Sequence, residues 1–293
     1  MDSRREWKLL EIIGETRNFF SSIGIEDARL QAELLLGDIL NIERLDLYLQ
    51  FERSLTIVEV DLYREHVRKR ASGMPIQYVL GRASFRHLDL IVTPEVLIPR
   101  PETELLVDLA LDHIFKSEVP RYLDLCCGSG ALALSIAHES KKAFVVGSDL
   151  SPSALKIAGN NADRNFLSDK VFWIGSDLFE SLNFSEFDVI VCNPPYIPQN
   201  QINNLQTEIK NFEPRLALDG GEDGLDYYRR IVKDSVNYLR VGGSLILEVG
   251  DGQADEVTKL IDHYGCFECL NVVNDLNDRP RIVTGVKKSH EKY

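Results

Sequence analysis

Apolar side chains recur at helical spacing throughout residues 1–72. The two clearest sets are Leu9, Ile12, Ile13, Thr16 and Phe20, followed by Ala28, Ala32, Leu35, Leu36 and Ile39. Side chains three and four residues apart lie on one face of a helix. Thr56 and Glu59 have the spacing of a capping box ahead of a further helix. The pattern predicts a small helical bundle over residues 1–72, of the kind that docks a partner or covers a site.

The pattern changes after residue 72. Residues 73–98 combine Gly and Pro with alternating β-forming residues, which is typical of a β-hairpin connector between domains. Over residues 99–293 short apolar runs alternate with amphipathic stretches. The predicted strands are 122–126, 144–149, 171–175, 187–192, 244–249, 266–272 and 281–286. Such alternation predicts an α/β domain with a mostly parallel sheet and helices on both faces.

Composition limits the possible classes of protein. The chain has 293 residues and a net charge of −13, which argues against a protein that grips nucleic-acid backbone through its overall charge. No apolar run approaches the roughly 20 residues of a membrane span, and the N-terminus lacks the features of a secretory signal. The five cysteines are an odd number, and Cys126 and Cys127 are adjacent. We therefore expect no disulfide framework, and a cytoplasmic protein.

A glycine-rich turn links the first predicted strand of the α/β domain to a helix. Gly128 and Gly130 follow Asp124, and Asp149 ends the next predicted strand, 21 residues after Gly128. Glycines let a ligand approach the backbone, and a carboxylate at that spacing can accept both hydroxyls of an adenosine ribose. A nucleoside cofactor is therefore expected. A dinucleotide stays possible, but the acidic Asp124 favours the cationic methionine part of S-adenosylmethionine over a pyrophosphate.

A second motif, Asn193-Pro194-Pro195-Tyr196, follows the predicted strand 187–192. The prolines fix the backbone and remove two N–H donors, so carbonyl groups are presented rigidly. The Asn193 side-chain oxygen and the Pro194 carbonyl can each accept a hydrogen bond from an NH₂ group, and Tyr196 offers a face for stacking. An amide nitrogen is a poor nucleophile, and two acceptors that hold its protons orient it for attack on a methyl group.

With these motifs the chain resembles the amino-methyltransferases, and among them the protein-(glutamine-N5) methyltransferases of class 1 peptide-chain release factors. The resemblance covers nearly the whole chain and rests on the segments 73–81, 98–104, 124–130, 188–196, 213–218, 220–225 and 279–283. It implies a seven-stranded, Rossmann-like methyltransferase domain whose last strand is antiparallel, and an N-terminal bundle that helps recognise the release factor. It also implies methylation of the glutamine in the Gly-Gly-Gln loop. We expect a monomer that does not bind nucleic acid directly.

The resemblance also implies roles for individual residues. Asp149 would hold the ribose of S-adenosylmethionine and Leu178 would border its adenine. The methionine part would contact Asp124, Asn193 and the turn residues Cys126, Cys127, Gly128, Ser129 and Gly130. The glutamine side chain would be held by Asn193, Pro194, Pro195 and Tyr196, of which Asn193, Pro194 and Tyr196 are the expected catalytic residues.

The chain departs from the family pattern at two places. Relatives usually have glycine at the position of Cys126, and we expect the cysteine to be tolerated there if its φ is negative. Asn277-Asp278-Arg279-Pro280 replaces a turn that usually consists of small residues.

Three further segments carry weaker predictions. Arg100–Glu104 precedes a helix, so its Pro and Glu residues either cap that helix or border a substrate entrance. Residues 197–224 show little periodicity and suggest a lid or docking surface, which an ion pair between Glu213 and Arg215 could anchor. Cys266 and Cys269 lie in a predicted strand, where their side chains should face opposite sides, so we expect no zinc site.

Three other functions share some of these motifs. Glutamine methylation of a ribosomal protein would use the same site, but that branch usually lacks the Pro-Glu-Thr-Glu continuation after Arg100. DNA adenine N6-methylation shares the Asn-Pro-Pro-Tyr motif, and the acidic charge disfavours it. An NAD-dependent oxidoreductase would use the glycine-rich turn and Asp149, but would leave Asn193–Tyr196 without a role.

Overall fold

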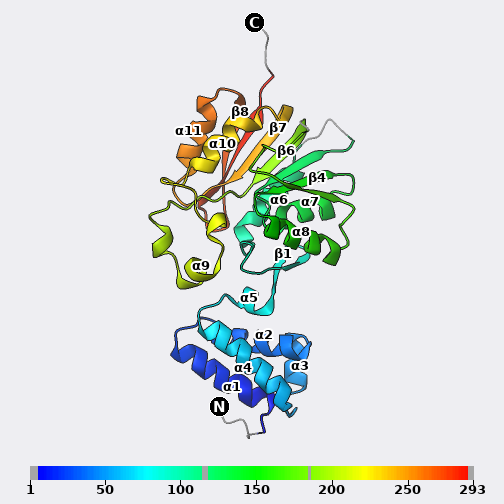
Figure 1. Ribbon diagram of the computed structural model, residues 1–293, viewed down its shortest axis with the longest axis vertical. Coiled ribbons are helices and arrows are strands. Elements are labelled where there is room, and N and C mark those ends of the chain that lie inside the picture. Colours follow the sequence, from blue (N-terminus) through cyan, green and yellow to red (C-terminus); the bar gives the residue numbers. More distant parts are fainter. Residues whose placement is uncertain (1–5, 114–117, 184–185, 290–293) are drawn as a thin grey trace. The chain divides into compact units, whose positions relative to one another are not determined.

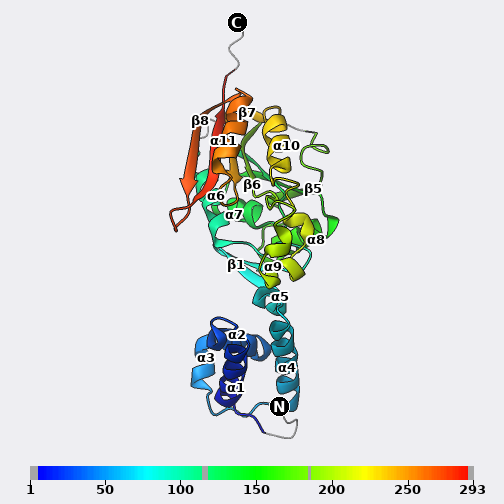
Figure 2. The same ribbon diagram turned by 90° about the vertical axis from the view of Figure 1, so that its left-hand side faces the viewer.

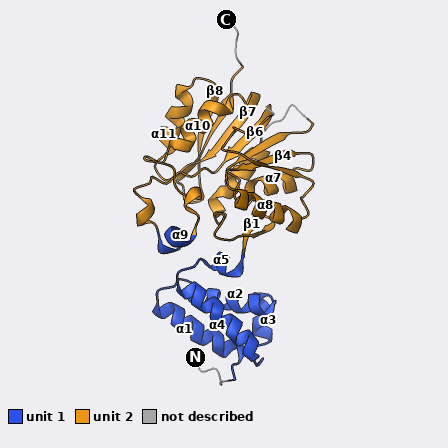
Figure 3. Ribbon diagram, viewed as in Figure 1, with its two compact units in different colours: residues 1–81, 206–212 blue, residues 82–205, 213–293 orange. Residues whose placement is uncertain are grey.

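The computed structural model describes residues 6–113, 118–183 and 186–289. The ends of the predicted bundle and of the predicted α/β domain, residues 1–5 and 290–293, lie outside the described residues. Contacts divide the chain into two compact units (Figure 3). Unit 1 comprises residues 1–81 and 206–212, and unit 2 comprises residues 82–205 and 213–293.

Unit 1 is helical, as its apolar spacing predicts. Its helices are α1 (Leu9–Ser22), α2 (Ala28–Leu40), α3 (Arg44–Leu49), α4 (Ile57–Ala71), α5 (Ile76–Leu80) and α9 (Thr207–Phe212). All five members of the first apolar set are buried in α1, and Thr56 and Glu59 form the predicted capping box of α4. Helix α9 comes from a distant part of the chain, and its Glu208 forms an ion pair with the buried Arg70 of α4 at 2.6 Å.

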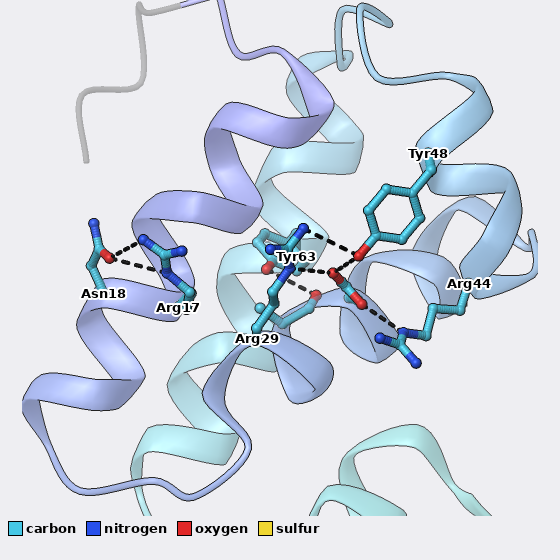
Figure 4. A network of polar contacts seen from close by, with 8 residues as sticks. Arg17, Asn18, Arg29, Arg44, Tyr48 and Tyr63 are labelled. Carbon is cyan, nitrogen blue, oxygen red and sulfur yellow. Dashed lines mark hydrogen bonds and ion pairs between the residues drawn. The ribbon is translucent and has the colours of Figure 1, made fainter.

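A buried carboxylate joins two helices of the same unit, α2 and α3. Glu33 of α2 is 1% exposed and accepts hydrogen bonds from Arg29, Arg44 and Tyr48, and the donors lie around it in Figure 4. A buried charge is tolerated only when it is paired and hydrogen-bonded. These bonds therefore tie α3 to α2, and the hydroxyl of Tyr63 in α4 reaches the Ala32 carbonyl at 3.1 Å.

One part of the predicted connector differs from the expected strand. Residues 76–80 form helix α5, because Pro75 precedes the helix as its cap and Gly81 ends it in a left-handed conformation with φ of 71°. The predicted hairpin follows as the antiparallel pair β1 (Arg82–Phe85) and β2 (Leu88–Ile91).

Unit 2 is a seven-stranded sheet with helices on both faces (Figures 1 and 2). Its strands are β3 (Arg121–Leu125), β4 (Phe144–Asp149), β5 (Val171–Gly175), β6 (Phe187–Cys192), β7 (Leu239–Glu248), β8 (Phe267–Asn274) and β9 (Pro280–Lys287). Their order is β5-β4-β3-β6-β7-β9-β8, in which β9 is antiparallel to both its neighbours and the pairs from β5 to β7 are parallel. The predicted fold class, with an antiparallel last strand, is confirmed.

The helices of unit 2 cover two apolar faces. These helices are η1 (Pro101–Thr103), α6 (Glu104–Leu111), α7 (Ala131–Glu139), α8 (Pro152–Arg164), η2 (Ile202–Asn204), η3 (Arg215–Ala217), α10 (Asp226–Ser235) and α11 (Ala254–His263). One core cluster contains residues of α6 and α7, and the other contains residues of α10 and α11. Strand β7 begins earlier than predicted, at Leu239, because its start pairs with β6 across a register shift despite Gly242 and Gly243.

The sheet order brings the sequence motifs together. Strands β4, β3 and β6 are neighbours, and all three run in the same direction. Their carboxyl ends carry Asp149, the turn after Leu125, and Asn193. In open α/β sheets ligands bind at this edge, next to the point where the strand order reverses.

Candidate functional site

The glycine-rich turn connects β3 to α7 through left-handed backbone. The φ angles are 57° at Cys126, 53° at Gly128 and 82° at Gly130. The condition stated for a tolerated cysteine, a negative φ, is therefore not met at Cys126, because the chain reverses immediately after β3 in the left-handed region. A Cβ at Gly130 would lie 2.8 Å from the ring of Trp173, so glycine is required for packing as well as for conformation.

Asp149 is bound into this turn. One carboxylate oxygen, Oδ2, accepts the Gly128 N–H at 2.8 Å, and the other, Oδ1, accepts the Ser151 N–H at 2.8 Å. Burial raises the pKa of Asp149, and these backbone hydrogen bonds oppose the shift. Each carboxylate oxygen can accept more than one hydrogen bond, so Asp149 retains acceptor capacity toward the cavity.

Asp124 lies deeper than the sequence suggested. It is 1% exposed, and its Oδ2 accepts the Ala133 N–H of α7 at 3.0 Å. Its Oδ1 is buried without a hydrogen-bond partner in the structure, and burial raises the pKa of Asp124 to about 8. Asp124 is not among the residues that line the cavity described next.

A cavity of about 220 Å³ lies over the carboxyl ends of β4, β3 and β6. Of the predicted site residues, it is lined by Cys126, Gly128, Asp149, Leu178, Asn193 and Pro195. The remaining predicted residues, Asp124, Cys127, Ser129, Gly130, Pro194 and Tyr196, are not part of its lining. The structure thus brings Asp149, Leu178 and Asn193 to a single cavity from three different segments of the chain.

Several lining residues have no counterpart in the sequence prediction. They come from the segment after β2, from the residues that follow β4 and β5, from the loop after β6, and from helices α8 and α10: Glu95, Val96, Leu97, Leu150, Ser151, Ala154, Ser176, Asp177, Pro214, Leu216, Ala217 and Tyr227. The Glu213–Leu218 segment carries a family motif and three of these lining residues, Pro214, Leu216 and Ala217, but no periodic pattern in the sequence indicates that they face a cavity.

Hydrogen bonds hold the Asn193–Tyr196 segment at both of its ends. The Asn193 Nδ2 group donates to Thr103 Oγ1 at 3.2 Å, and the Tyr196 carbonyl accepts from Gln253 Nε2 at 2.9 Å. A Cβ at Gly220 would lie 2.8 Å from the Tyr196 Cα, which explains a glycine at that position. Burial raises the pKa of Tyr196 to about 12, so its hydroxyl stays protonated at neutral pH.

The ion pair expected between Glu213 and Arg215 does not form. Glu213 is buried and contacts Arg100 Nη2 through Oε1 at 2.5 Å, whereas Arg215 contacts Asp219 at 3.1 Å. Arg215 and Asp219 lie one helical turn apart, which favours this local pair. The Arg100–Glu213 pair instead joins two segments of unit 2 that are distant in the sequence and that both carry predicted motifs.

A metal centre has no support among the described residues. They contain no group of three or more His, Cys, Asp or Glu side chains that could hold a metal ion. Cys266 and Cys269 form no disulfide bond. Cys269 has a left-handed φ of 53° and lies where the pairing register of β8 shifts. No helix within the described ranges is long and apolar enough to cross a membrane.

Two family comparisons agree with this arrangement. Residues 11–81 match the PrmC N-terminal domain, and residues 102–222 match the methyltransferase small domain. Among solved structures, the human Mettl16 catalytic domain in complex with an RNA hairpin aligns with a TM-score of 0.57 at 16% identity, covering 78% of this chain and 82% of that one. A methyltransferase from Pyrococcus furiosus aligns with a TM-score of 0.52 at 15% identity, covering 69% of this chain and 90% of that one. These structural likenesses show the fold.

Full-length relatives are more informative. The release factor glutamine methyltransferase of Geobacter sulfurreducens is 40% identical over 279 residues, which cover 95% of this chain and 96% of the relative. The protein of the same name in Chlorobaculum tepidum is 37% identical over 96% of this chain and 98% of its own length. That of Moorella thermoacetica is 38% identical over 96% of this chain and 99% of its own length. The chain therefore belongs to the family of release factor glutamine methyltransferases.

Proposed function

We propose that this protein transfers a methyl group from S-adenosylmethionine to the side-chain amide nitrogen of the glutamine in the Gly-Gly-Gln motif of class 1 peptide-chain release factors. The observation that carries the proposal is the meeting of Asn193, Asp149 and the glycine-rich turn at one cavity. Asp149 suits the nucleoside part of a cofactor, and Asn193 suits an acceptor that carries an NH₂ group. The family supplies the identity of the acceptor.

The residues of the cavity fit S-adenosylmethionine. Asp149 has free acceptor capacity for the ribose hydroxyls, and the buried Leu178 gives the adenine an apolar surface. Cys126 and Gly128 would lie along the methionine part, and the absence of a side chain at Gly128 lets a ligand approach the backbone there. The cofactor supplies a methyl group on a positively charged sulfur.

The contribution of the protein to the reaction is orientation. The Asn193 Oδ1 atom and the Pro194 carbonyl accept the two protons of the glutamine NH₂ group, so its lone pair is directed toward the methyl carbon. As the new N–C bond forms and the C–S bond breaks, positive charge develops on the nitrogen, and the two acceptors stabilise it. The nitrogen then loses one of its protons to solvent, which leaves a neutral N-methyl amide.

Unit 1 provides surface for the protein substrate. Helix α3 exposes Leu45 and Leu49, each 79% exposed, and α4 exposes Ile57 and Val58, at 73% and 68%. Apolar side chains gathered on exposed faces are typical of partner-binding surfaces. We propose that unit 1 recognises the release factor, that the protein acts as a monomer, and that it does so in the cytoplasm, where its five free cysteines stay reduced.

A direct assay tests the proposal. The protein is incubated with purified release factor and methyl-labelled S-adenosylmethionine, and the product is mapped by peptide mass spectrometry. We expect one methyl group on the Gly-Gly-Gln glutamine, and no labelling of a release factor in which that glutamine is replaced by alanine. Labelling of ribosomal protein or DNA in place of release factor would overturn the acceptor, and calorimetric binding of NAD instead of S-adenosylmethionine would overturn the cofactor.

A further inference from the structure

Three polar side chains run from the cavity into the interior of unit 2. The Asn193 Nδ2 group donates to Thr103 Oγ1 at 3.2 Å, and the Thr103 hydroxyl donates to Glu248 Oε2 at 2.6 Å. Thr103 is 5% exposed and Glu248 is 2% exposed. Only Asn193, at the outer end of this series, lines the cavity.

While Glu248 is ionised, the direction of these hydrogen bonds is fixed from the inner end. An ionised carboxylate can only accept, so Thr103 must give its single hydroxyl proton to Glu248. The Thr103 oxygen then has only lone pairs left for Asn193. Asn193 must therefore turn its NH₂ group toward Thr103, which directs its carbonyl oxygen, Oδ1, away from Thr103.

We propose that Thr103 and Glu248 are positioning residues that set the amide orientation of Asn193, so that Oδ1 rather than Nδ2 is offered to the substrate. The inference rests on the proposed function, in which Asn193 accepts a proton of the glutamine NH₂ group. An asparagine turned the other way would present a donor to a donor, and the substrate would lose one of its two acceptors. The two residues act through Asn193 and contact no reacting atom.

The surrounding structure holds both residues in place. Thr103 ends η1, which begins at Pro101, and its backbone N–H donates to the Arg100 carbonyl at 3.1 Å. Glu248 is the last residue of β7, which pairs with β6 just ahead of Asn193. The buried Tyr228 of α10 donates its hydroxyl to the Glu248 carbonyl at 2.8 Å. These contacts hold the backbone from which the Glu248 side chain reaches Thr103.

The charge of Glu248 controls the direction of the hydrogen bonds from Glu248 through Thr103 to Asn193. The charged and titratable side chains that act on it from the neighbouring segments are Arg100, Glu102, Tyr196, Tyr228 and Arg281. Burial raises the pKa of Glu248 to about 7, against the hydrogen bond from Thr103 and the nearby Arg281. Once protonated, Glu248 can donate to Thr103, and Thr103 can then donate to Asn193. With the hydrogen bonds in this order, Asn193 turns its NH₂ group toward the substrate and its oxygen toward Thr103. The rate of methyl transfer should therefore fall as the pH drops below neutral.

Variants of Thr103 test the hydrogen bond by kinetics. Thr103→Val keeps the shape but removes the hydroxyl, and Thr103→Ser keeps the hydroxyl. We expect Thr103→Val to lower kcat with release factor about 10-fold while the Kd of S-adenosylmethionine stays within about twofold of the wild type. Thr103→Ser should restore most of kcat. Equal rates in all three proteins, or equal impairment of the two variants, would overturn the role of the hydroxyl.

Glu248→Gln tests the charge, by a measurement that a purely structural role would not affect. In the wild type kcat should rise with pH through about pH 7, whereas Glu248→Gln should lose this rise because its amide does not titrate. If the variant is folded and its kcat still falls at acid pH as in the wild type, the role of Glu248 is refuted. Thermal unfolding of the variant identifies any loss of fold.

A spectroscopic measurement separates this inference from the proposed function. The side-chain amide signal of Asn193 is assigned in ¹⁵N-labelled protein through its loss in Asn193→Ala. It should shift with pH in the wild type, and should stay constant over the same range in Glu248→Gln. If the signal behaves in this way but release factor is not methylated, the proposed acceptor is wrong and the orientation of Asn193 stands. If the signal does not shift with pH in either protein, the inference fails, whichever substrate accepts the methyl group.

Discussion

Single residues at the carboxyl ends of three strands carry the proposed chemistry. Asp149 and Asn193 are each fixed by hydrogen bonds before any substrate arrives, Asp149 by backbone N–H groups and Asn193 by Thr103. Groups already held in place need little reorganisation during the reaction. The substitutions with the largest kinetic effects should therefore be those that remove an acceptor from this edge.

Asn193→Ala removes one of the two proposed acceptors of the substrate NH₂ group. We expect kcat to fall by about 10²–10³-fold, the range seen when one group that stabilises a transition state is removed. The Kd of S-adenosylmethionine should change by less than about threefold, because Asp149 and the turn remain. Single-turnover kinetics and calorimetry measure the two quantities. A variant with unchanged kcat would contradict the role of Asn193.

Cys126 has a backbone conformation that favours glycine, with φ of 57°. The left-handed region costs a residue with a Cβ roughly 1–2 kcal/mol of conformational free energy. Glycine avoids this cost, but its larger conformational entropy in the unfolded chain offsets part of the stabilisation. Cys126→Gly should therefore raise the free energy of unfolding by about 0.5–1 kcal/mol. Cys126→Ala is the matched control, since it removes the thiol but keeps the Cβ, and should give no such gain in urea unfolding. Equal stability of the two variants would argue against backbone strain at this position.

At the scale of elements, the strand-to-helix junction after β3 depends on Asp124. This carboxyl joins β3 to the start of α7 through the Ala133 N–H, and burial raises its pKa to about 8. A raised pKa means that the folded state binds the proton more tightly than the unfolded chain. Stability from this group is therefore present at low pH, and it is lost as pH rises from the unfolded pKa of Asp, roughly 4, toward 8.

Asp124→Asn should remove this dependence on pH. The asparagine stays neutral, its Oδ1 can still accept from Ala133, and it carries no charge to bury. We expect the stability of the variant relative to the wild type to increase between about pH 6 and about pH 8. Asp163→Asn on the exposed side of α8 serves as a surface control and should run parallel to the wild type. Parallel curves for Asp124→Asn and the wild type would refute a raised pKa.

At the scale of the whole molecule, two units share one chain that passes between them more than once. Segment 206–212 leaves unit 2 within the loop after Asn193–Tyr196 and belongs to unit 1, where Arg70 pairs with Glu208. The loop predicted as a lid or docking surface is therefore divided: its ends belong to the methyltransferase unit and its middle belongs to the helical unit. This covalent arrangement links the proposed recognition unit to the loop that follows Asn193–Tyr196.

The proposed role of unit 1 predicts an effect on binding without an effect on chemistry. Replacing Leu45 and Leu49 with Ser should raise the KM for intact release factor about 5–10-fold and leave kcat unchanged. A short Gly-Gly-Gln peptide should be methylated as in the wild type. Leu276→Ser, at a position 98% exposed in unit 2, is the matched control and should change neither value. An unchanged KM in the double variant would exclude α3 from the docking surface.

The sequence by itself determined the elements and the motifs. Helical spacing located α1, α2 and α4, and apolar runs located all seven strands of the large sheet. This is possible because an element that buries one face, or a strand that is wholly buried, has a characteristic pattern of apolar residues over a short stretch of sequence. Asp149 and Asn193 can also be identified locally, because Asp149 ends a predicted strand at a fixed spacing from the glycine-rich turn and Asn193 begins the Asn-Pro-Pro-Tyr motif after another. The glutamine acceptor rested on resemblance, and the full-length relatives agree with it.

Only the tertiary structure decided which residues meet. The pairing of Glu213 with Arg100, the burial of Asp124 and the series from Asn193 to Glu248 depend on segments up to 145 residues apart, whose approach no local period encodes. The left-handed φ of Cys126 and the helix at Ile76–Leu80 follow from the turns that the packed elements require. Local sequence fixes which face of an element is apolar, whereas the contacts that orient a reactive side chain form only once distant elements are packed together.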